Sequence, residues 1–342
     1  GGEHYDDLLV DVLKKLALLM NARHEKPPVV IVESTLTPGR SDEIVLPILK
    51  EAGIEIGKDM LYGVAPRRDW FVSPEKSLKR LPRVFGGTNR DTTELMREAL
   101  SVVCDNLVPA PDHKHAEMVK SIENAYRHME ITLANQLSLA YPDVNMTEVL
   151  RLVGTKWNIG TYHPSFGTGG YCIPLSSQYV LLGARHPEKI TILKETIDAD
   201  RKQPEIVAES LNKRGFKNVG ILGLAYKGDI KVDILSPTIK LAKRLKELGI
   251  DVKVNDPYYT KDEIARITGT EAFDFPAGLA EFDALLIVAD HQQYKFTTHN
   301  SILDSLKKCK LILDNTEVWK DINFKKKGIE YHISGDAGWI KM

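Results

Sequence analysis

Cys172 is the residue whose type and setting most clearly suggest chemistry. It follows Gly169 and Gly170 in the segment FGTGGYCIP, and glycines allow backbone N–H groups to approach a ligand closely. Such a setting can also make a thiol nucleophilic. A small core position beside a turn is the more common place for a free cysteine. The spacing alone therefore leaves a nucleophile and a core residue both open.

Lys120 and Asn124 form a second candidate pair, because they lie one helical turn apart in the segment HAEMVKSIENAYR. An ammonium and an amide on one helix face can converge on one oxygen and stabilise a developing oxyanion. The alternative is a solvated helix face that carries an ordinary lysine.

Polar residues also follow two predicted strands. Ser34 and Thr35 come directly after VVIV, and ligands of open α/β sheets bind beyond the carboxyl ends of strands. Tyr226 and Lys227 follow the strand GILGLA, where the lysine could hold a phosphate. A turn that only caps the next helix explains the first segment equally well, and a plain strand-to-turn junction explains the second.

The remaining cysteines and histidines suggest little chemistry. Cys104 and Cys309 lie in apolar or lysine-rich surroundings, which favour structural roles. His113 and His115 lack a neighbouring cysteine or carboxylate cluster, so we predict no metal site.

The elements that must position these residues alternate between strands and helices. The strand PPVVIVES, the helix SDEIVLPILKEAG and the strands LYGVAP and RVFGG predict a partial Rossmann-like domain over residues 1–108. Residues 109–205 are predicted to be a central helical domain with a long helix over 113–140, interrupted by the glycine-rich segment before Cys172. Strands at NVGILGLAY, DVKVND, ALLIVAD, LILDN and EYHIS predict a C-terminal Rossmann-like domain with a parallel sheet over 206–342. The predicted fold class is therefore α/β.

Composition restricts the partners. The 342 residues include 46 basic and 47 acidic side chains, so the whole chain offers no electrostatic reason to bind nucleic acid or a membrane surface. No apolar run is long enough to cross a bilayer, and three separated cysteines argue against a disulfide framework. These features predict a cytoplasmic protein.

Taken together and in order, the motifs resemble one family. The order is ESTLTPG, the lysine and asparagine of KSIEN, GGYCIP, GLAYKGD, VNDP, and then VADH and LILDN. This order resembles the UDP-glucose/GDP-mannose dehydrogenase family, including the UDP-N-acetylhexosamine 6-dehydrogenases, over essentially the whole chain.

The resemblance implies NAD-dependent oxidation of a nucleotide sugar at C6, from CH2OH to carboxylate. Cys172 would form a thiohemiacetal and then a thioester, while Lys120 and Asn124 would stabilise oxyanions. Thr35 would lie near the nicotinamide and the attacking water, with Ser34 beside it in the cofactor site. The implied partners are a UDP-sugar and a second copy of the chain, which would pair through the long helix. The implied substrate-binding residues are Phe166, Gly167, Gly169, Gly170, Tyr226 and Lys227.

Several positions depart from the family pattern. Arg67 occupies the place of a glutamate that helps to position water, and Asp69 could compensate. Ser176 replaces an aspartate, Leu175 replaces a lysine, and Ile234 replaces an arginine that commonly contacts the nucleotide. We therefore interpret the chain as a divergent member.

Further departures concern the cofactor and the substrate surface. Arg67, Arg68 and Trp70 could form a different, cationic substrate surface. No GxGxxG fingerprint occurs in the sequence, although a complete member would use one to bind the NAD pyrophosphate. We therefore expect that the N-terminal part of the cofactor domain is missing, that one sheet edge is exposed, and that this chain binds NAD weakly or not at all.

Two alternatives remain open. A non-catalytic sugar-nucleotide-binding or scaffold protein would account for the departures, and it predicts equal alkylation rates for all three cysteines. A β-hydroxyacid-type dehydrogenase shares the lysine and asparagine on a helix, but it has no use for a nucleophilic cysteine. That alternative predicts that Cys172→Ser keeps activity.

Overall fold

The computed structural model describes residues 3–20, 26–69 and 74–340, so Trp70 lies outside the described part. The chain forms two compact units. The first unit comprises Gly1–Tyr126 with Leu175–Thr191, and the second comprises Arg127–Pro174 with Ile192–Met342. The three predicted domains stay a prediction, although helix α7 (Thr191–Lys213) runs through the boundary expected at residue 205.

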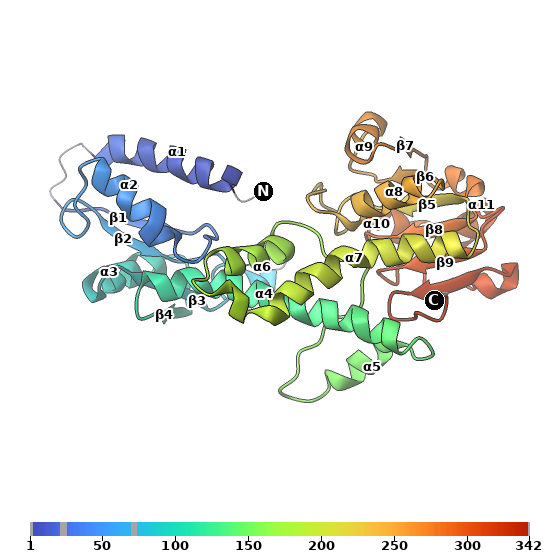
Figure 1. The fold of residues 1–342 in the computed structure, drawn as a ribbon, viewed down its shortest axis with the longest axis horizontal. Coiled ribbons are helices and arrows are strands. Elements are labelled where there is room, and N and C mark those ends of the chain that lie inside the picture. Colours follow the sequence, from blue (N-terminus) through green and yellow to red (C-terminus); the bar gives the residue numbers. More distant parts are fainter. Residues whose placement is uncertain (1–2, 21–25, 70–73, 341–342) are drawn as a thin grey trace. The chain divides into compact units, whose positions relative to one another are not determined.

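The first unit is built on a four-stranded sheet with the order β1-β2-β3-β4 (Figure 1). Its strands are β1 (Val29–Val32), β2 (Leu61–Val64), β3 (Arg83–Gly87) and β4 (Leu107–Pro109). Its helices are α1 (Glu3–Met20), the π-helical turn η1 (Ser41–Val45), α2 (Leu46–Glu51), η2 (Pro74–Lys76) and α3 (Arg90–Ser101). The start of α4 (His113–Ala140), most of α6 (Cys172–Leu182) and η3 (Pro187–Lys189) complete the unit. Strand β1 pairs only with β2 among the described residues, so it is an edge of this sheet.

One strand pairing in this sheet differs from the expected β-α-β pattern, in which neighbouring strands would be parallel. Strands β1 and β2 pair in parallel, as do β3 and β4, but β2 and β3 pair antiparallel. A parallel pair needs a crossover of a dozen or more residues, usually a helix. Between β2 and β3 the described residues contain only the short helix η2, so the chain returns in the opposite direction.

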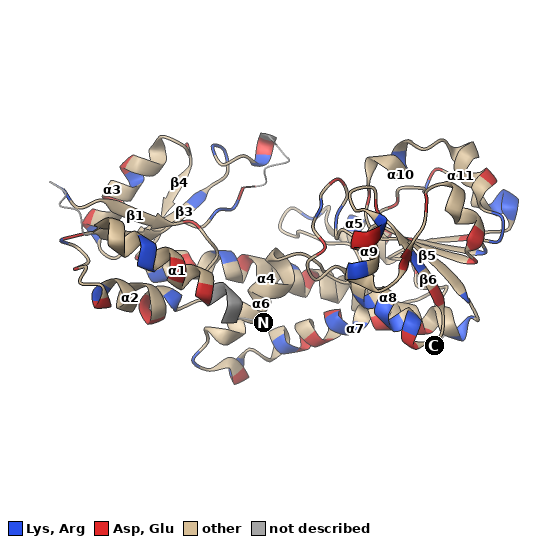
Figure 2. Cartoon of the chain, turned by 90° about the horizontal axis from the view of Figure 1, so that it is seen from above, with Lys and Arg blue, Asp and Glu red and all other residues tan. Residues whose placement is uncertain are grey.

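The second unit contains a six-stranded sheet with the order β10-β9-β8-β5-β6-β7, and every pair is parallel, as predicted for this region. Its strands are β5 (Asn218–Leu222), β6 (Asp251–Asn255), β7 (Glu271–Ala272), β8 (Ala284–Ile287), β9 (Leu311–Asp314) and β10 (Glu330–Ile333). Its remaining helices are α5 (Met146–Val153), α8 (Pro237–Glu247), α9 (Lys261–Thr268), η4 (Ala277–Glu281), α10 (Gln292–Phe296), α11 (His299–Ser305) and η5 (Phe324–Lys327). Acidic and basic residues are interspersed along α7, so neither sign of charge dominates this helix (Figure 2).

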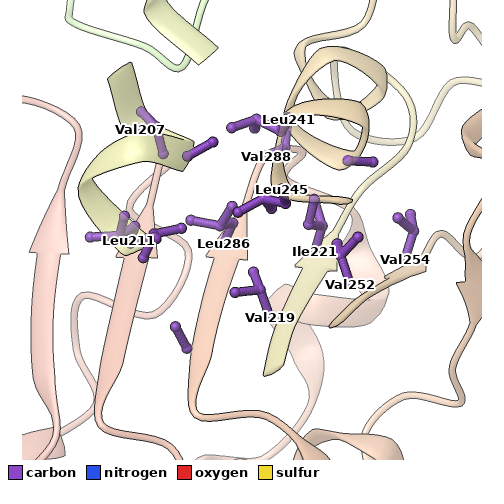
Figure 3. Packing of buried hydrophobic residues seen from close by; sticks show 14 of the residues in the cluster. Val207, Leu211, Val219, Ile221, Leu241, Leu245, Val252, Val254, Leu286 and Val288 are labelled. Carbon is purple, nitrogen blue, oxygen red and sulfur yellow. The ribbon is translucent and has the colours of Figure 1, made fainter. Parts of the chain in front are cut away.

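The core of the second unit lies between this parallel sheet and the helices that cover it. Buried leucines and valines of α7 and α8 pack over β-branched residues of the central strands (Figure 3). Because helices cover the sheet, the central strands β8 and β9 are buried along their whole length, as is typical of parallel strands. The residues labelled in that view are Val207, Leu211, Val219, Ile221, Leu241, Leu245, Val252, Val254, Leu286 and Val288. This core fixes the carboxyl ends of β5, β6 and β8, from which the turns of the site extend.

Candidate functional site

Cys172 is exposed, and it is the first residue of α6. The loop before it turns sharply at Gly170, where φ is +80° and the N–H donates to the carbonyl oxygen of Ile234 at 2.7 Å. A Cβ at Gly169 would lie 2.6 Å from Cβ of Tyr226, and one at Gly170 would lie 2.9 Å from its ring. The paired glycines are therefore needed for the close approach of Tyr226, which a ligand-based interpretation of the motif does not explain.

Tyr226 shares the surroundings of Cys172 within the second unit. Burial raises the pKa of Tyr226, and the charge of a Cys172 thiolate raises it further, whereas the charge of Arg127 lowers it. Arg127 donates from Nε to the hydroxyl oxygen of Tyr162 at 3.0 Å and also lies over its ring. Arg127, a residue that the motifs did not reveal, thus acts on the same tyrosine as the thiol, and Tyr162 is its partner.

The buried carboxylate of Asp200 on α7 anchors the loop before Cys172 through Thr168. Its two oxygens accept from the backbone N–H of Thr168 at 2.8 Å and from the Thr168 hydroxyl at 2.7 Å. His128 of α4 lies 3.3 Å from Oδ2, and both ionisable side chains are almost fully buried. Burial raises the pKa of Asp200, but the hydrogen bonds from His128 and Thr168 outweigh it, so the pKa lies below its ordinary value. This network fixes the backbone four residues before Cys172.

Phe166 and Gly167, which were predicted to bind the substrate, have structural contacts in this loop. The side chain of Phe166 is buried in the core of the second unit, and its N–H donates to Asn315 Oδ1 at 3.1 Å. Gly167 has φ of +118° and lies against Pro204, where a Cβ would be 3.3 Å away. The loop is therefore held by its backbone, and any contact of Phe166 with a ligand would have to come from its main chain.

The turn that carries Tyr226 and Lys227 is held by a buried aspartate and histidine. The N–H groups of Leu224 and Ala225 donate to Asp256 Oδ2 at 2.8 and 2.9 Å. The N–H of Asp229 donates to His291 Nδ1 at 3.0 Å, and His291 Nε2 lies 3.1 Å from Asp256 Oδ2. Because Nδ1 accepts, the ring proton is on Nε2 and donates to Asp256. Asp256 of the VNDP motif and His291 of the VADH motif thus both accept hydrogen bonds from the backbone of this turn. The side chain of Lys227 is exposed on the turn.

In the first unit, Ser34 and Thr35 are exposed beyond the end of β1, as expected for residues that meet a ligand. The next residue, Leu36, is buried, and its carbonyl oxygen accepts from the hydroxyl of Ser121 at 3.1 Å. Ser121 follows Lys120 on α4. This hydrogen bond ties the loop of Thr35 to the helix that carries Lys120 and Asn124.

Lys120 and Asn124 each have a defined partner in the same unit. Asn124 is buried, and its Nδ2 donates to the hydroxyl oxygen of Ser176 on α6 at 3.1 Å. Lys120 Nζ donates to Glu123 Oε1 at 3.2 Å, and Glu123 Oε2 accepts from Arg68 Nε at 2.8 Å. Ser176, which departs from the family pattern, therefore orients the amide, and Glu123 is a further residue that the motifs did not reveal.

The Arg67 segment has its own ion pairs. Arg67 donates from Nε and Nη2 to both oxygens of Asp69 at 2.6 Å, and this lowers the pKa of Asp69. Buried Arg83 pairs with Glu33, and Arg67 Nη1 lies 3.8 Å from the other oxygen of Glu33. Because both oxygens of Asp69 are engaged, the structure gives no support to the idea that Asp69 replaces the family glutamate.

The other candidate groups are separated or buried. His113 lies 3.0 Å from Asp42 and His115 lies 2.8 Å from Asp112, so the two histidines face different partners. Within residues 3–20, 26–69 and 74–340 there is no group of three metal-binding side chains. Over the same ranges, every helix is too short or too polar to cross a bilayer. Cys104 and Cys309 are buried, as their predicted structural roles require, and burial raises the pKa of Cys309 to about 12.

Comparison with known families gives two matches. The central domain of the UDP-glucose/GDP-mannose dehydrogenase family matches residues 114–201, and the UDP binding domain of that family matches residues 220–321. Together the matches include Lys120, Asn124, Cys172, Tyr226 and Lys227.

Individual relatives point the same way. The chain is 28% identical over 323 residues to UDP-N-acetyl-D-mannosamine dehydrogenase of Methanocaldococcus jannaschii. The aligned region covers 92% of this chain and 71% of the relative. It is 29% identical over 300 residues to Protein CapL of Staphylococcus aureus, covering 84% and 70%. It is 28% identical over 283 residues to UDP-N-acetyl-D-glucosamine 6-dehydrogenase of Salmonella typhi, covering 78% and 65%.

Solved structures share the fold. The UDP-D-ManNAc dehydrogenase of Pyrococcus horikoshii superimposes with a TM-score of 0.81 at 23% identity, over 97% of this chain and 77% of that one. The NDP-N-acetyl-D-galactosaminuronic acid dehydrogenase of Methanosarcina mazei Go1 gives 0.79 at 22% identity, over 98% and 74%. These two likenesses support the α/β architecture of Rossmann-like domains.

Proposed function

Because the chain belongs to the UDP-glucose/GDP-mannose dehydrogenase family, we propose that it serves to oxidise a nucleotide sugar at C6, from CH2OH to carboxylate. The substrate we propose is a UDP-N-acetylhexosamine or a UDP-hexose, in line with the names of the relatives. The observation that supports this most is the exposed Cys172 at the start of α6, since Cys104 and Cys309 are buried.

The proposed chemistry needs a nucleophilic thiolate at the second oxidation. Loss of a hydride from C6 and a proton from its oxygen gives an aldehyde, and the Cys172 sulfur then adds to the aldehyde carbon. The thiohemiacetal then loses a second hydride from carbon and the proton of its hydroxyl group, and it becomes a thioester. Water attacks the thioester carbon, the C–S bond breaks, and the carboxylate leaves with the thiolate restored. A covalent intermediate thus divides a difficult step into easier ones.

The other proposed residues act on oxygen atoms and on the substrate. Lys120 and Asn124 would stabilise the oxyanions, and their fixed partners Glu123 and Ser176 support this role. Tyr226 and Lys227 would bind the sugar nucleotide, together with the backbone of residues 166–170. Exposed Lys227 gives the turn a cation that a phosphate can reach.

The cofactor fits this chain only in part. Ser34 and Thr35 present exposed hydroxyls beyond the end of β1, and these suit the nicotinamide end of a dinucleotide. When bound, NAD supplies the hydride acceptor for both oxidations. The sequence contains no GxGxxG to hold the pyrophosphate, so we predict weak NAD binding by these 342 residues.

Calorimetric titration tests this proposal directly. We expect UDP-GlcNAc, UDP-glucose or UDP to bind with a Kd in the micromolar range, on the order of −8 kcal/mol, without NAD present. NAD as a separate titrant should give little or no heat. If the chain binds none of the three UDP ligands, the proposal of a nucleotide-sugar substrate is wrong.

We also propose that the chain forms a homodimer through α4. Apolar side chains of this helix are exposed in the single chain, among them Met118, Tyr126 and Leu133. Sedimentation equilibrium should therefore show twice the chain mass, and Leu133→Glu should shift the equilibrium toward the monomer. A single species at the mass of one chain would contradict the dimer.

A further inference from the structure

The carboxylate of Glu123 joins two cations from separate parts of the first unit. One oxygen accepts from Lys120 Nζ at 3.2 Å, and the other accepts from Arg68 Nε at 2.8 Å. Arg68 also donates from Nη1 to the carbonyl oxygen of Pro82 at 3.0 Å. Glu123 is therefore held, through the oxygen that Lys120 does not bind, by an arginine that is itself anchored to a backbone carbonyl.

The burial of these side chains makes the contact more than an ordinary helix-surface pair. An exposed pair three residues apart stabilises a helix only slightly, because two flexible side chains must be ordered in water. Here the side chains of Lys120, Glu123 and Arg68 are 16%, 27% and 30% exposed. The planar guanidinium of Arg68 already restricts the carboxylate of Glu123. Pairing with Lys120 therefore costs less side-chain entropy than it would in an exposed pair.

The same face of α4 carries Asn124, whose amide is held by Ser176. Both groups that would stabilise an oxyanion thus have a neighbour that fixes them: Ser176 for the amide and Glu123 for the ammonium. Preorganised donors stabilise charge because they need no reorganisation when the charge develops.

We propose that Glu123 is the positioning residue of Lys120, and that Arg68 holds Glu123 in place. The inference rests on the proposed function for the role of Lys120, but the contact itself is tested independently of activity. The proposal also assigns a role to Arg68, which lies in the segment that departs from the family pattern.

Acetylation of individual lysines, followed by peptide mass spectrometry, tests the contact on the chain as it is. Glu123→Gln keeps the shape of the side chain but removes its charge, so Lys120 should react roughly three- to tenfold faster at limiting reagent and fixed pH. Lys114 lies on the same helix as Lys120 and pairs with Asp42 of η1; it is the internal reference and should not change. Arg68→Gln should give a smaller increase, and Glu123→Asp should restore part of the protection.

The matched control is Glu130→Gln, two turns further along α4 at an exposed position. An unchanged rate for Lys120 in both Glu123→Gln and Arg68→Gln would overturn the proposal, as would an equal increase in Glu130→Gln. Calorimetry of the unmodified chain separates the two claims. If no nucleotide sugar binds, the proposed function fails, whereas the acetylation rates still decide whether Glu123 holds Lys120.

Discussion

Iodoacetamide is expected to alkylate Cys172 at least about a hundredfold faster than Cys309, because only a thiolate reacts. Cys172 is exposed, whereas Cys309 is 8% exposed and burial raises its pKa to about 12. Cys104 is 2% exposed, and its sulfur lies 3.5 Å from the carbonyl oxygens of Leu81 and Asn106. At pH 8 the thiolate fraction of Cys309 is on the order of one in ten thousand.

Peptide mass spectrometry at short times would measure the three rates in one sample. The control is the same reaction in denaturant, where the three thiols should become similar. Equal rates in the native chain would remove the basis for a nucleophilic Cys172, and they would favour a binding or scaffold protein.

Replacing Asp200 by asparagine should lower the free energy of unfolding by about 2–4 kcal/mol at pH 7. The substitution keeps the size of the side chain but removes the charge beside buried His128, and it leaves only one oxygen for the two Thr168 donors. Denaturant unfolding of both proteins would measure the difference. The loop before Cys172 should also loosen, since its anchor at Thr168 is weakened.

The pH dependence of this effect has a definite sign. The pKa of Asp200 in the folded protein lies below the unfolded value, which is near 3.9 for aspartate. The stabilisation is therefore complete above the unfolded pKa and is lost as the pH falls through the lower, folded pKa. The difference between wild type and Asp200→Asn should be constant from about pH 5 to 7 and should shrink below about pH 4.

Asp198→Asn provides the control, because Asp198 lies two residues earlier on α7 and is exposed. Its effect should remain within about 0.5 kcal/mol. A similar small effect for Asp200→Asn would mean that the buried network does not hold the loop.

The elements of this fold were predictable where the sequence pattern is strong. The β-branched run before Glu33 and the five apolar runs after residue 206 lie on strands, and the long helix extends over His113–Ala140 as expected. The antiparallel pairing of β2 and β3 was not predicted, because the connecting segment has no clear periodicity; its described residues contain the short helix η2 and no long crossover helix. The two-residue strand β7 is too short to give a pattern.

The site was predictable only as far as its motifs reach. Cys172, Lys120 and Asn124 stood out by type and spacing, yet the groups that hold them lie far away along the chain. Asp200 reaches back 32 residues to Thr168, and Ser176 lies 52 residues from Asn124. Such partners are ordinary serines and acids on helices, and only the packing of the chain shows that they are engaged.

The measurement that tests the central claim most directly is protection of Cys172 from alkylation by a nucleotide sugar. If the chain binds this substrate next to the thiol, a saturating UDP-sugar should slow the alkylation of Cys172 by tenfold or more, roughly the unbound fraction at ten times the Kd. The slow rates of Cys104 and Cys309 should not change. If Cys172 reacts equally fast with and without bound UDP-sugar, the thiol does not meet the substrate, and the proposed oxidation through a cysteine thioester is contradicted.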